Sequence, residues 1–278
     1  MSDPVLRALD DEGVLLVTLN RPAKKNAFDD AQWDGLRDAL NDAREDPRVA
    51  VVVVTGAGND FSAGQDLTAF GRSSAPRDDG QQSGYYGCME ALVAFDKPLL
   101  AAAKGVGVGI GATFLFHCDI VYVGESVRLR LPFVSLGLVP EGASSYMLQQ
   151  VIGSQRAAEL FYTAEWIDAG QAVKLGMAAG VFPDAQLLEA TLAVAREIAQ
   201  HPVSALQATK RTLLRAHREG IRAAFEAEDL GMKEQAGSPE NVEAVRAFLE
   251  KRKPNFRQFR RRSDALAIGT GRSGSGTL

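Results

Sequence analysis

The feature that most restricts the fold of this chain is a run of β-branched residues, VAVVVVT at residues 49–55, which is apolar throughout. A strand of this kind is typical of a parallel sheet whose two faces are both covered. A second such run, VLLVTLN, lies at residues 14–20, and between the two runs Trp33, Leu36 and Leu40 recur at helical spacing. Because a helix that joins two parallel strands makes a right-handed crossover, the pattern predicts an α/β fold.

The same alternation continues and then gives way to helices. A helix over residues 85–95 precedes the apolar run PLLAAAKGV, and DIVYVGE at 119–125 has the pattern of another strand. From residue 143 on, the periodicity predicts helices near 143–151, 155–163, 184–200, 203–217, 220–235 and 239–251. We therefore predict a core with the active site over residues 1–198, a helical region over 199–262, and a low-complexity, disordered tail over 263–278.

Composition restricts the function classes. A chain of 278 residues that is 46% hydrophobic can bury a large core without disulfides or metals. Cys88 and Cys118 show no metal-ligand spacing, which predicts free thiols in a reducing compartment. The net charge of −4 argues against general nucleic-acid affinity, and neither a signal peptide nor a stretch of about 20 apolar residues is present. We expect a cytoplasmic protein without a membrane segment.

Two segments offer backbone groups to a ligand. In FSAGQDL at 61–67, small residues allow close approach to the main chain, although an ordinary capped turn would have the same pattern. In KGVGVGIGATFLFHCD at 104–119, alternating glycines precede a hydrophobic helix whose first N–H groups are unpaired. Gly107, Gly109 and Ala112 also fit a dinucleotide fingerprint, but such fingerprints open a domain, whereas this one lies a hundred residues inside.

The third segment is LPFVSLGLVPEGASSYM at 131–147, in which Glu141 stands between a proline and a glycine directly before a helix. An isolated loop glutamate is usually only solvated, but the apolar setting and the two segments above argue against that interpretation here. Ser144 and Ser145 are expected to satisfy the start of the following helix rather than to act as nucleophiles, since no GxSxG motif is present. His117, which shows no metal spacing, is expected to be structural.

Taken together, in this order and spacing, the three segments resemble the crotonase (enoyl-CoA hydratase/isomerase) superfamily over about residues 12–256. NRPAKKNAF at 20–28, AAELFYTAEWIDAGQAVKLGMAAGVFP and the closing EKRKPNF resemble its landmarks as well. The resemblance implies a spiral of ββα turns followed by helices that trimerise, an acyl-CoA thioester substrate, and neither a metal nor a cofactor other than the coenzyme A of the substrate. It implies a homotrimer or a dimer of trimers.

The resemblance also implies a site. The thioester carbonyl would lie between the backbone N–H groups of Ala63 and Ile110, where fixed donors stabilise an enolate by about 3 kcal/mol each. The implied substrate and coenzyme A contacts are Lys24, Lys25, Ala27, Ser62, Gly64, Gln65, Asp66, Leu67, Gly109, Phe133, Lys251 and Phe256. A polar loop at 71–84 is expected to act as a lid.

Which reaction follows depends on the carboxylates. The two glutamates of hydratases in this superfamily fall on Thr113 and Phe133, so hydration is not expected. Glu141 falls where peroxisomal-type Δ3,Δ2-enoyl-CoA isomerases carry their single acid/base, which predicts an isomerase. Two alternatives stay open: dehalogenase or hydrolase chemistry with Glu141 as nucleophile, and a non-catalytic coenzyme A- or RNA-binding role suggested by the basic segment KRKPNFRQFRRR at 251–262.

Overall fold

The computed structural model describes residues 3–66 and 84–260 of the chain. The predicted contact Leu67, the proposed lid except for its last residue, and the tail at 263–278 lie outside the described residues. Within those residues, no helix combines the length and the apolar character needed to cross a membrane. Both cysteines are free thiols, as predicted.

Six strands form the larger sheet, in the order β1-β2-β3-β4-β6-β9. They are β1 (Val5–Leu9), β2 (Val14–Leu19), β3 (Val51–Gly56), β4 (Leu99–Ala103), β6 (Ile120–Gly124) and β9 (Gly180–Phe182). From β2 to β9 every neighbouring pair is parallel, and β1 adds an antiparallel edge. The first four residues of β3 are fully buried, which confirms the prediction of a strand covered on both faces.

A second sheet of three short strands has the order β5-β7-β8, with β5 (Val106–Val108), β7 (Arg128–Arg130) and β8 (Trp166–Asp168). The chain leaves β4 of the large sheet, enters β5 of the small one and then forms a helix. It repeats this step from β6 to β7. This alternation is the ββα spiral that the sequence predicted, and it brings the turn after β5 close to the middle of the molecule.

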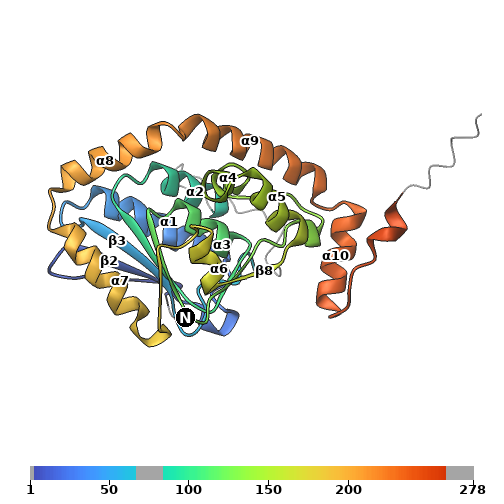
Figure 1. Ribbon diagram of the computed structural model, residues 1–278, viewed down its shortest axis with the longest axis horizontal. Helices are drawn as coiled ribbons and strands as arrows, with labels where there is room; N and C mark the ends of the chain where they lie inside the picture. Colours follow the sequence, from blue (N-terminus) through green and yellow to red (C-terminus); the bar gives the residue numbers. More distant parts are fainter. Residues whose placement is uncertain (1–2, 67–83, 261–278) are drawn as a thin grey trace, which may run out of the picture.

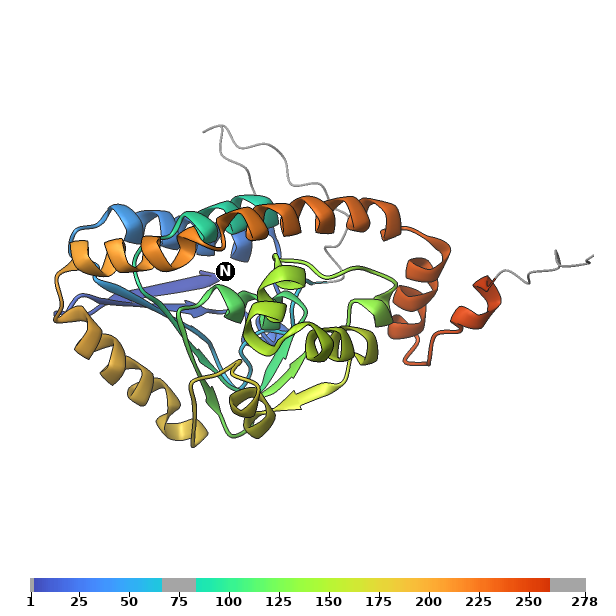
Figure 2. The same ribbon diagram turned by 45° about the horizontal axis from the view of Figure 1, so that its top comes forward.

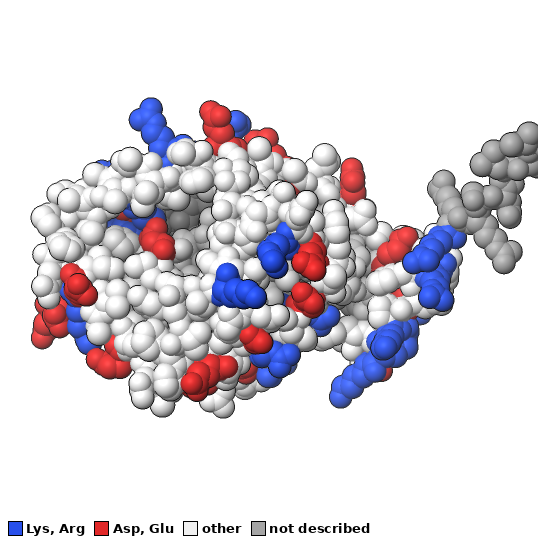
Figure 3. Space-filling model, viewed as in Figure 1, with Lys and Arg blue, Asp and Glu red and all other residues white. Residues whose placement is uncertain are grey.

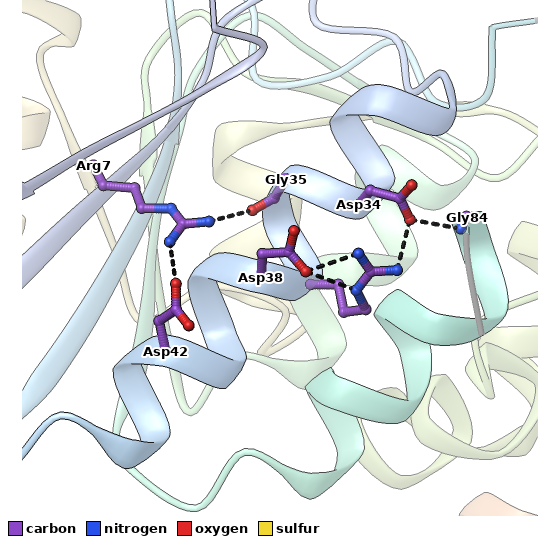
Figure 4. Close-up of polar contacts among 7 residues, drawn as sticks. Arg7, Asp34, Gly35, Asp38, Asp42 and Gly84 are labelled. Atoms are coloured by element: carbon purple, nitrogen blue, oxygen red, sulfur yellow. Dashed lines mark hydrogen bonds and ion pairs between the residues drawn. The ribbon is translucent and has the colours of Figure 1, made fainter. Parts of the chain in front are cut away.

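The first helices pack against the large sheet and are tied to each other by buried charge. Helix α1 (Asp30–Glu45) is capped by Asp29, whose side chain accepts the Gln32 N–H, and α2 (Gly84–Ala94) lies beside it. Arg37 of α1 is 2% exposed and donates to Asp34, which also accepts the backbone N–H of Gly84 at 2.9 Å. Figure 4 shows this junction, which fixes the start of α2. A neighbouring ion pair between Arg7 and Asp42 ties β1 to α1.

The remaining helices follow the predicted order. They are α3 (Ile110–Thr113), α4 (Ser144–Ile152), α5 (Ser154–Thr163), α6 (Ala169–Lys174), α7 (Asp184–Ala199), α8 (Val203–Arg215), α9 (Arg218–Gln235) and α10 (Pro239–Leu249). Figures 1 and 2 show α8 and α9 as one long arc along one side of the molecule, with α10 at its end. Helix α9 packs on α4 through Ala143, Ile221 and Ala224.

The second half also contains two short strands that the sequence did not predict. β8 and β9 lie between the helices expected at 155–163 and 184–200. Each has three residues, too few for a periodic pattern to emerge, and each is defined by pairing with a distant strand. The predicted boundary near residue 199 falls between α7 and α8, and a separate helical unit there stays a prediction.

Candidate active site

The segment 61–66 runs beside β5 and presents its backbone to the centre of the molecule. Ser62 pairs with Gly107 as parallel strands do, and further along the Phe28 N–H donates to Gly64 O at 2.7 Å while the Asp66 N–H donates to Phe28 O at 2.8 Å. Since successive N–H groups of an extended chain point to opposite sides, the Gln65 N–H faces away from Phe28. It has no hydrogen-bond acceptor among the described residues.

The structure contradicts Ala63 as the predicted oxyanion donor. Its N–H donates to the carbonyl oxygen of Lys25 at 2.8 Å, so it is already used to fix the loop. Gly64, with φ 88°, interrupts the extended backbone between Ala63 and Gln65, so the Gln65 N–H does not share the direction of the Ala63 N–H. The side chain of Gln65 is held by the Trp33 indole N–H, which donates to its Oε1 at 2.9 Å.

The second predicted donor, Ile110, opens helix α3. Gly109 before it has φ 55° and ψ −125°, a conformation open only to glycine, and this turns the first N–H of the helix away from β5. A side chain on Gly64 would stand 2.4 Å from the carbonyl oxygen of Val108, so the two loops touch backbone to backbone. The Gln65 N–H and the Ile110 N–H thus come from adjacent loops.

Glu141 lies next to the start of α3. Its Oε1 is 3.8 Å from where a side chain on Gly109 would begin, and the neighbouring Ile110 N–H favours its ionised form. Burial raises the pKa of Glu141 to about 7, the charge of Glu228 adds to this rise, and the Ile110 N–H opposes it. A carboxyl group with a pKa near 7 is present at neutral pH in both forms, as a group that takes and returns a proton must be.

The peptide group that follows Glu141 is held from two sides. The Gly142 N–H donates to the Tyr85 hydroxyl at 2.9 Å, and Nε2 of His117 lies 2.8 Å from Gly142 O. Because that carbonyl only accepts, Nε2 of His117 carries the proton. Burial lowers the pKa of His117 to about 4, so the ring is neutral in the physiological range. The expectation that His117 is structural is met.

A second carboxylate approaches from α9. Glu228 is 6% exposed; its Oε2 accepts the Ala143 N–H at 2.7 Å and its Oε1 accepts the Ser145 N–H at 2.8 Å. These are the first N–H groups of α4. The expectation that Ser144 and Ser145 satisfy this helix start is therefore wrong in part: α4 has no side-chain cap of its own, and the hydroxyl of Ser144 is buried without a partner among the described residues.

The predicted contacts near the chain start divide into two groups. Lys24 and Lys25 are exposed, with Lys25 Nζ 3.3 Å from Asp60 Oδ2, so their side chains are available to a ligand. Ala27 is buried at the end of the same loop. Ser62 is fully buried and its hydroxyl donates to the Asn26 carbonyl, so it shapes the loop and its predicted role in substrate contact is not supported.

Asp66 is nearly buried and pairs with Arg21 at 3.2 Å. It fixes the end of the loop against the segment that carries the two lysines. Phe133 is 4% exposed and packs beside the Phe161 ring. Thr113 is fully buried, and its hydroxyl has no partner among the described residues. Both positions where hydratases of the superfamily would carry glutamates are therefore buried in this chain, and neither carries an ionisable side chain.

Lys251 and Phe256 follow α10, at the end of the chain that projects from the body in Figures 1 and 2. Figure 3 shows basic side chains gathered over this end. Arg252 is anchored there by Glu243 at 2.6 Å. No contact within the described residues joins this segment to Lys24 or Lys25, so the interpretation that it reaches coenzyme A, in the same or a neighbouring subunit, stays a prediction.

Sequence reasoning missed three residues of the site, Gln65 as a donor, Tyr85 and Glu228. The first follows from the strand alternation once pairing with Phe28 is known. Tyr85 lies at a helix start whose register depends on the buried charges of α1. For Glu228 no local signal exists, because a glutamate on an amphipathic helix is normally a solvated residue.

The comparisons with known proteins agree with this geometry. A family model described as enoyl-CoA hydratase/isomerase matches residues 10–260. The chain is 34% identical to a 2,3-dehydroadipyl-CoA hydratase of Escherichia coli (strain K12), over 88% of this chain and 95% of that protein. It is 31% identical to enoyl-CoA delta isomerase 2 of Rattus norvegicus, over 88% of this chain but only 63% of that longer protein.

Among solved structures, an enoyl-CoA hydratase/isomerase from Pseudoalteromonas atlantica T6c aligns with a TM-score of 0.86 at 33% identity, covering 91% of this chain and 99% of the other. These similarities extend across both sheets and the helices after them. They place the chain with proteins that carry two different activity names.

Proposed function

The chain belongs to the enoyl-CoA hydratase/isomerase family, and we propose that within it the protein is an isomerase that moves the double bond of a 3-enoyl-CoA thioester to the 2 position. The observation that carries this choice is the state of the two carboxylates. Glu141 has a pKa raised to about 7, whereas both oxygens of Glu228 accept backbone N–H groups. One carboxylate is therefore left for proton transfer.

Hydration needs an acid and a base that act on water and on carbon at the same time. Thr113 and Phe133 stand at the family positions for those groups, and neither exchanges a proton in this pH range. Isomerisation needs one group, which removes a proton from C2 of the acyl chain and returns it to C4. Both carbons lie on one side of an extended chain, so a single carboxyl at Glu141 suffices.

The charge that forms in between lies on the thioester oxygen. When the C2 proton moves to Glu141, the electron pair of the C–H bond passes into a dienolate, and the N–H groups of Gln65 and Ile110 are oriented to hold its oxygen. Such fixed donors need no reorganisation at the moment of reaction. The proton then returns at C4, the double bond closes between C2 and C3, and the carboxylate is restored without any cofactor.

Ile110 links donor and base. In the free protein its N–H acts on the nearby Glu141 carboxylate and lowers the pKa of that group. A thioester oxygen that takes this N–H removes the interaction, so the pKa of Glu141 is expected to rise on substrate binding. The base would thus become stronger when a substrate with its carbonyl in place has arrived.

The test is a panel of 3-enoyl- and 2-enoyl-CoA esters, followed by ultraviolet absorbance of the conjugated thioester and by chromatography of the products. We expect 3-enoyl esters to become conjugated and 2-enoyl esters to gain no water. Formation of 3-hydroxyacyl-CoA at a comparable rate would show that the protein is a hydratase.

Glu141→Gln keeps the shape of the side chain and removes the base. Isomerisation should fall about 10²- to 10⁴-fold while affinity for a saturated acyl-CoA stays near that of the wild type. The rival chemistry, in which Glu141 attacks the substrate, would leave a covalent acyl-enzyme that mass spectrometry detects in the wild type.

A further inference from the structure

Helix α4 begins directly after the proposed base, and its start is unusual. Gly142 has φ 71° and Ala143 has φ 55°, so two successive residues occupy the left-handed region, one of them with a side chain. A single non-glycine residue there costs on the order of 1 kcal/mol and persists only where its surroundings hold it. The chain offers no local cap for this turn.

The restraint comes from α9, more than eighty residues away in the sequence. Glu228 accepts the N–H groups of Ala143 and Ser145. Burial raises the pKa of Glu228, and these hydrogen bonds oppose the rise because they favour the ionised carboxylate. Hydrogen bonds to an ionised acceptor are about twice as strong as those between neutral groups. The neighbouring α9 residue Phe225 stacks on the His117 ring, with centroids 6.4 Å apart.

We propose that Glu228 is a positioning residue for Glu141, because its buried carboxylate fixes the strained turn at Gly142 and Ala143 directly after the base. The same carboxylate also brings a like charge to the site of Glu141. The inference rests on the proposed acid/base role of Glu141. It joins the reactivity of the site to the packing of the helical region, since any shift of α9 along α4 would move both the turn and the charge.

Other titratable groups face the same turn from each packed element. Tyr85 of α2 accepts the Gly142 N–H, and its pKa is raised by burial and by the two glutamates. His117 is neutral. Asp229, the next residue of α9, accepts a hydrogen bond from Tyr86 at the surface. Of these groups it is Glu228 whose charge, together with burial, raises the pKa of Glu141, so its removal has a distinct electrostatic effect.

Two substitutions separate charge from geometry. Glu228→Gln removes the charge and places an amide NH₂, which cannot accept a hydrogen bond, opposite one of the two backbone N–H groups of Ala143 and Ser145. Glu228→Asp keeps the charge but is one methylene too short to reach both donors. Glu226→Gln on the same helix is the matched control, because Glu226 is exposed and pairs only with Arg222 among the described residues.

For Glu228→Gln we expect kcat on a 3-enoyl-CoA to fall about 10- to 100-fold with little change in KM, as misplacement of a reacting group does. The acid limb of its kcat/KM profile should move to lower pH. Glu228→Asp should lose rate with the acid limb retained, and Glu226→Gln should match the wild type. A Glu228→Gln enzyme within twofold of wild type and with an unmoved acid limb would overturn the proposal.

A measurement without turnover keeps this test apart from the proposed reaction. Protein labelled with ¹³C at the glutamate carboxyl is titrated by NMR, and the Glu141 signal is identified as the one missing from Glu141→Gln. A lower midpoint for Glu141 in Glu228→Gln supports the proposal even if the wild type isomerises none of the esters. An identical midpoint in wild type and Glu228→Gln refutes it, whatever the kinetics. If Glu228→Gln does not fold, Glu228→Asp decides: a lower rate with an unmoved Glu141 midpoint supports the proposal, and a wild-type rate refutes it.

Discussion

Replacing Glu141 by glutamine should make the protein more stable at alkaline pH. The raised pKa of Glu141 means that the folded protein holds this proton more tightly than the unfolded chain does. Below about pH 4.5 the residue is protonated in both states and costs nothing. As the pH rises through 7 the folded state must ionise a shielded carboxyl beside Glu228, and stability is lost.

The magnitude follows from the two pKa values. A change from 4.5 to about 7, at about 1.4 kcal/mol for each pH unit, corresponds to about 3 kcal/mol. Glu141 is only partly buried, so solvent screening makes this an upper bound, and about 1–3 kcal/mol is the expected range. The gain of Glu141→Gln over wild type should be smallest near pH 4.5 and reach its plateau near pH 8.

Only the difference between the two proteins isolates Glu141. His117 acts in the opposite direction, because its pKa is lowered from 6.5 to about 4 and its contribution is lost as the pH falls through that range. Both proteins contain His117, so its effect cancels. Urea unfolding at fixed protein concentration, from pH 4.5 to 8, gives the two curves. A difference that stays constant over this range would refute the claim that Glu141 is shielded and faces like charge.

Three further results are expected. Thr113→Val should raise the stability of the protein by about 1 kcal/mol in the same urea assay, because it removes a buried hydroxyl without a partner among the described residues. A lower stability of Thr113→Val would mean that this hydroxyl forms a hydrogen bond in solution. Lys25→Ala should weaken coenzyme A binding severalfold at low salt and flatten its salt dependence, as calorimetry can measure, and an unchanged affinity would count against this lysine. Light scattering should give three or six times 29.8 kDa, because α8–α10 expose Leu213, Leu230, Phe248 and Leu249 by more than 60% each, and a monomer at micromolar concentration would exclude the trimer.

The parts of the fold that were predictable from sequence are those with a long local period. The run at 49–55 gave β3, and the spacing of Trp33, Leu36 and Leu40 gave the buried face of α1, where each of these side chains is at most 1% exposed. The small sheet was not predictable, since its strands of three residues owe their conformation to partners elsewhere in the chain. The conformation of these short strands depends on tertiary pairing rather than on local sequence preference.

The same distinction divides the candidate site. Glu141 and Ile110 stand in motifs whose neighbours, a proline and glycines, already restrict the backbone, so the sequence could mark them as candidates. The choice between Ala63 and Gln65 depended on the positive φ of Gly64 between them and on pairing with Lys25 and Phe28, and a sequence without its pairing register cannot give these.

Glu228 shows why a single-carboxylate site can still depend on two carboxylates. A base that is to return its proton at a second carbon must stay in one place through both transfers, and the turn that carries Glu141 is held in a conformation that its own residues disfavour. A neutral acceptor would satisfy the same N–H groups less strongly and would leave the pKa of Glu141 closer to its ordinary value. The carboxylate of Glu228 both accepts the N–H groups of Ala143 and Ser145 and acts on the charge of Glu141, so it sets the geometry of the turn and the protonation of Glu141 together. Only the packing of α9 on α4 brings Glu228 to the site.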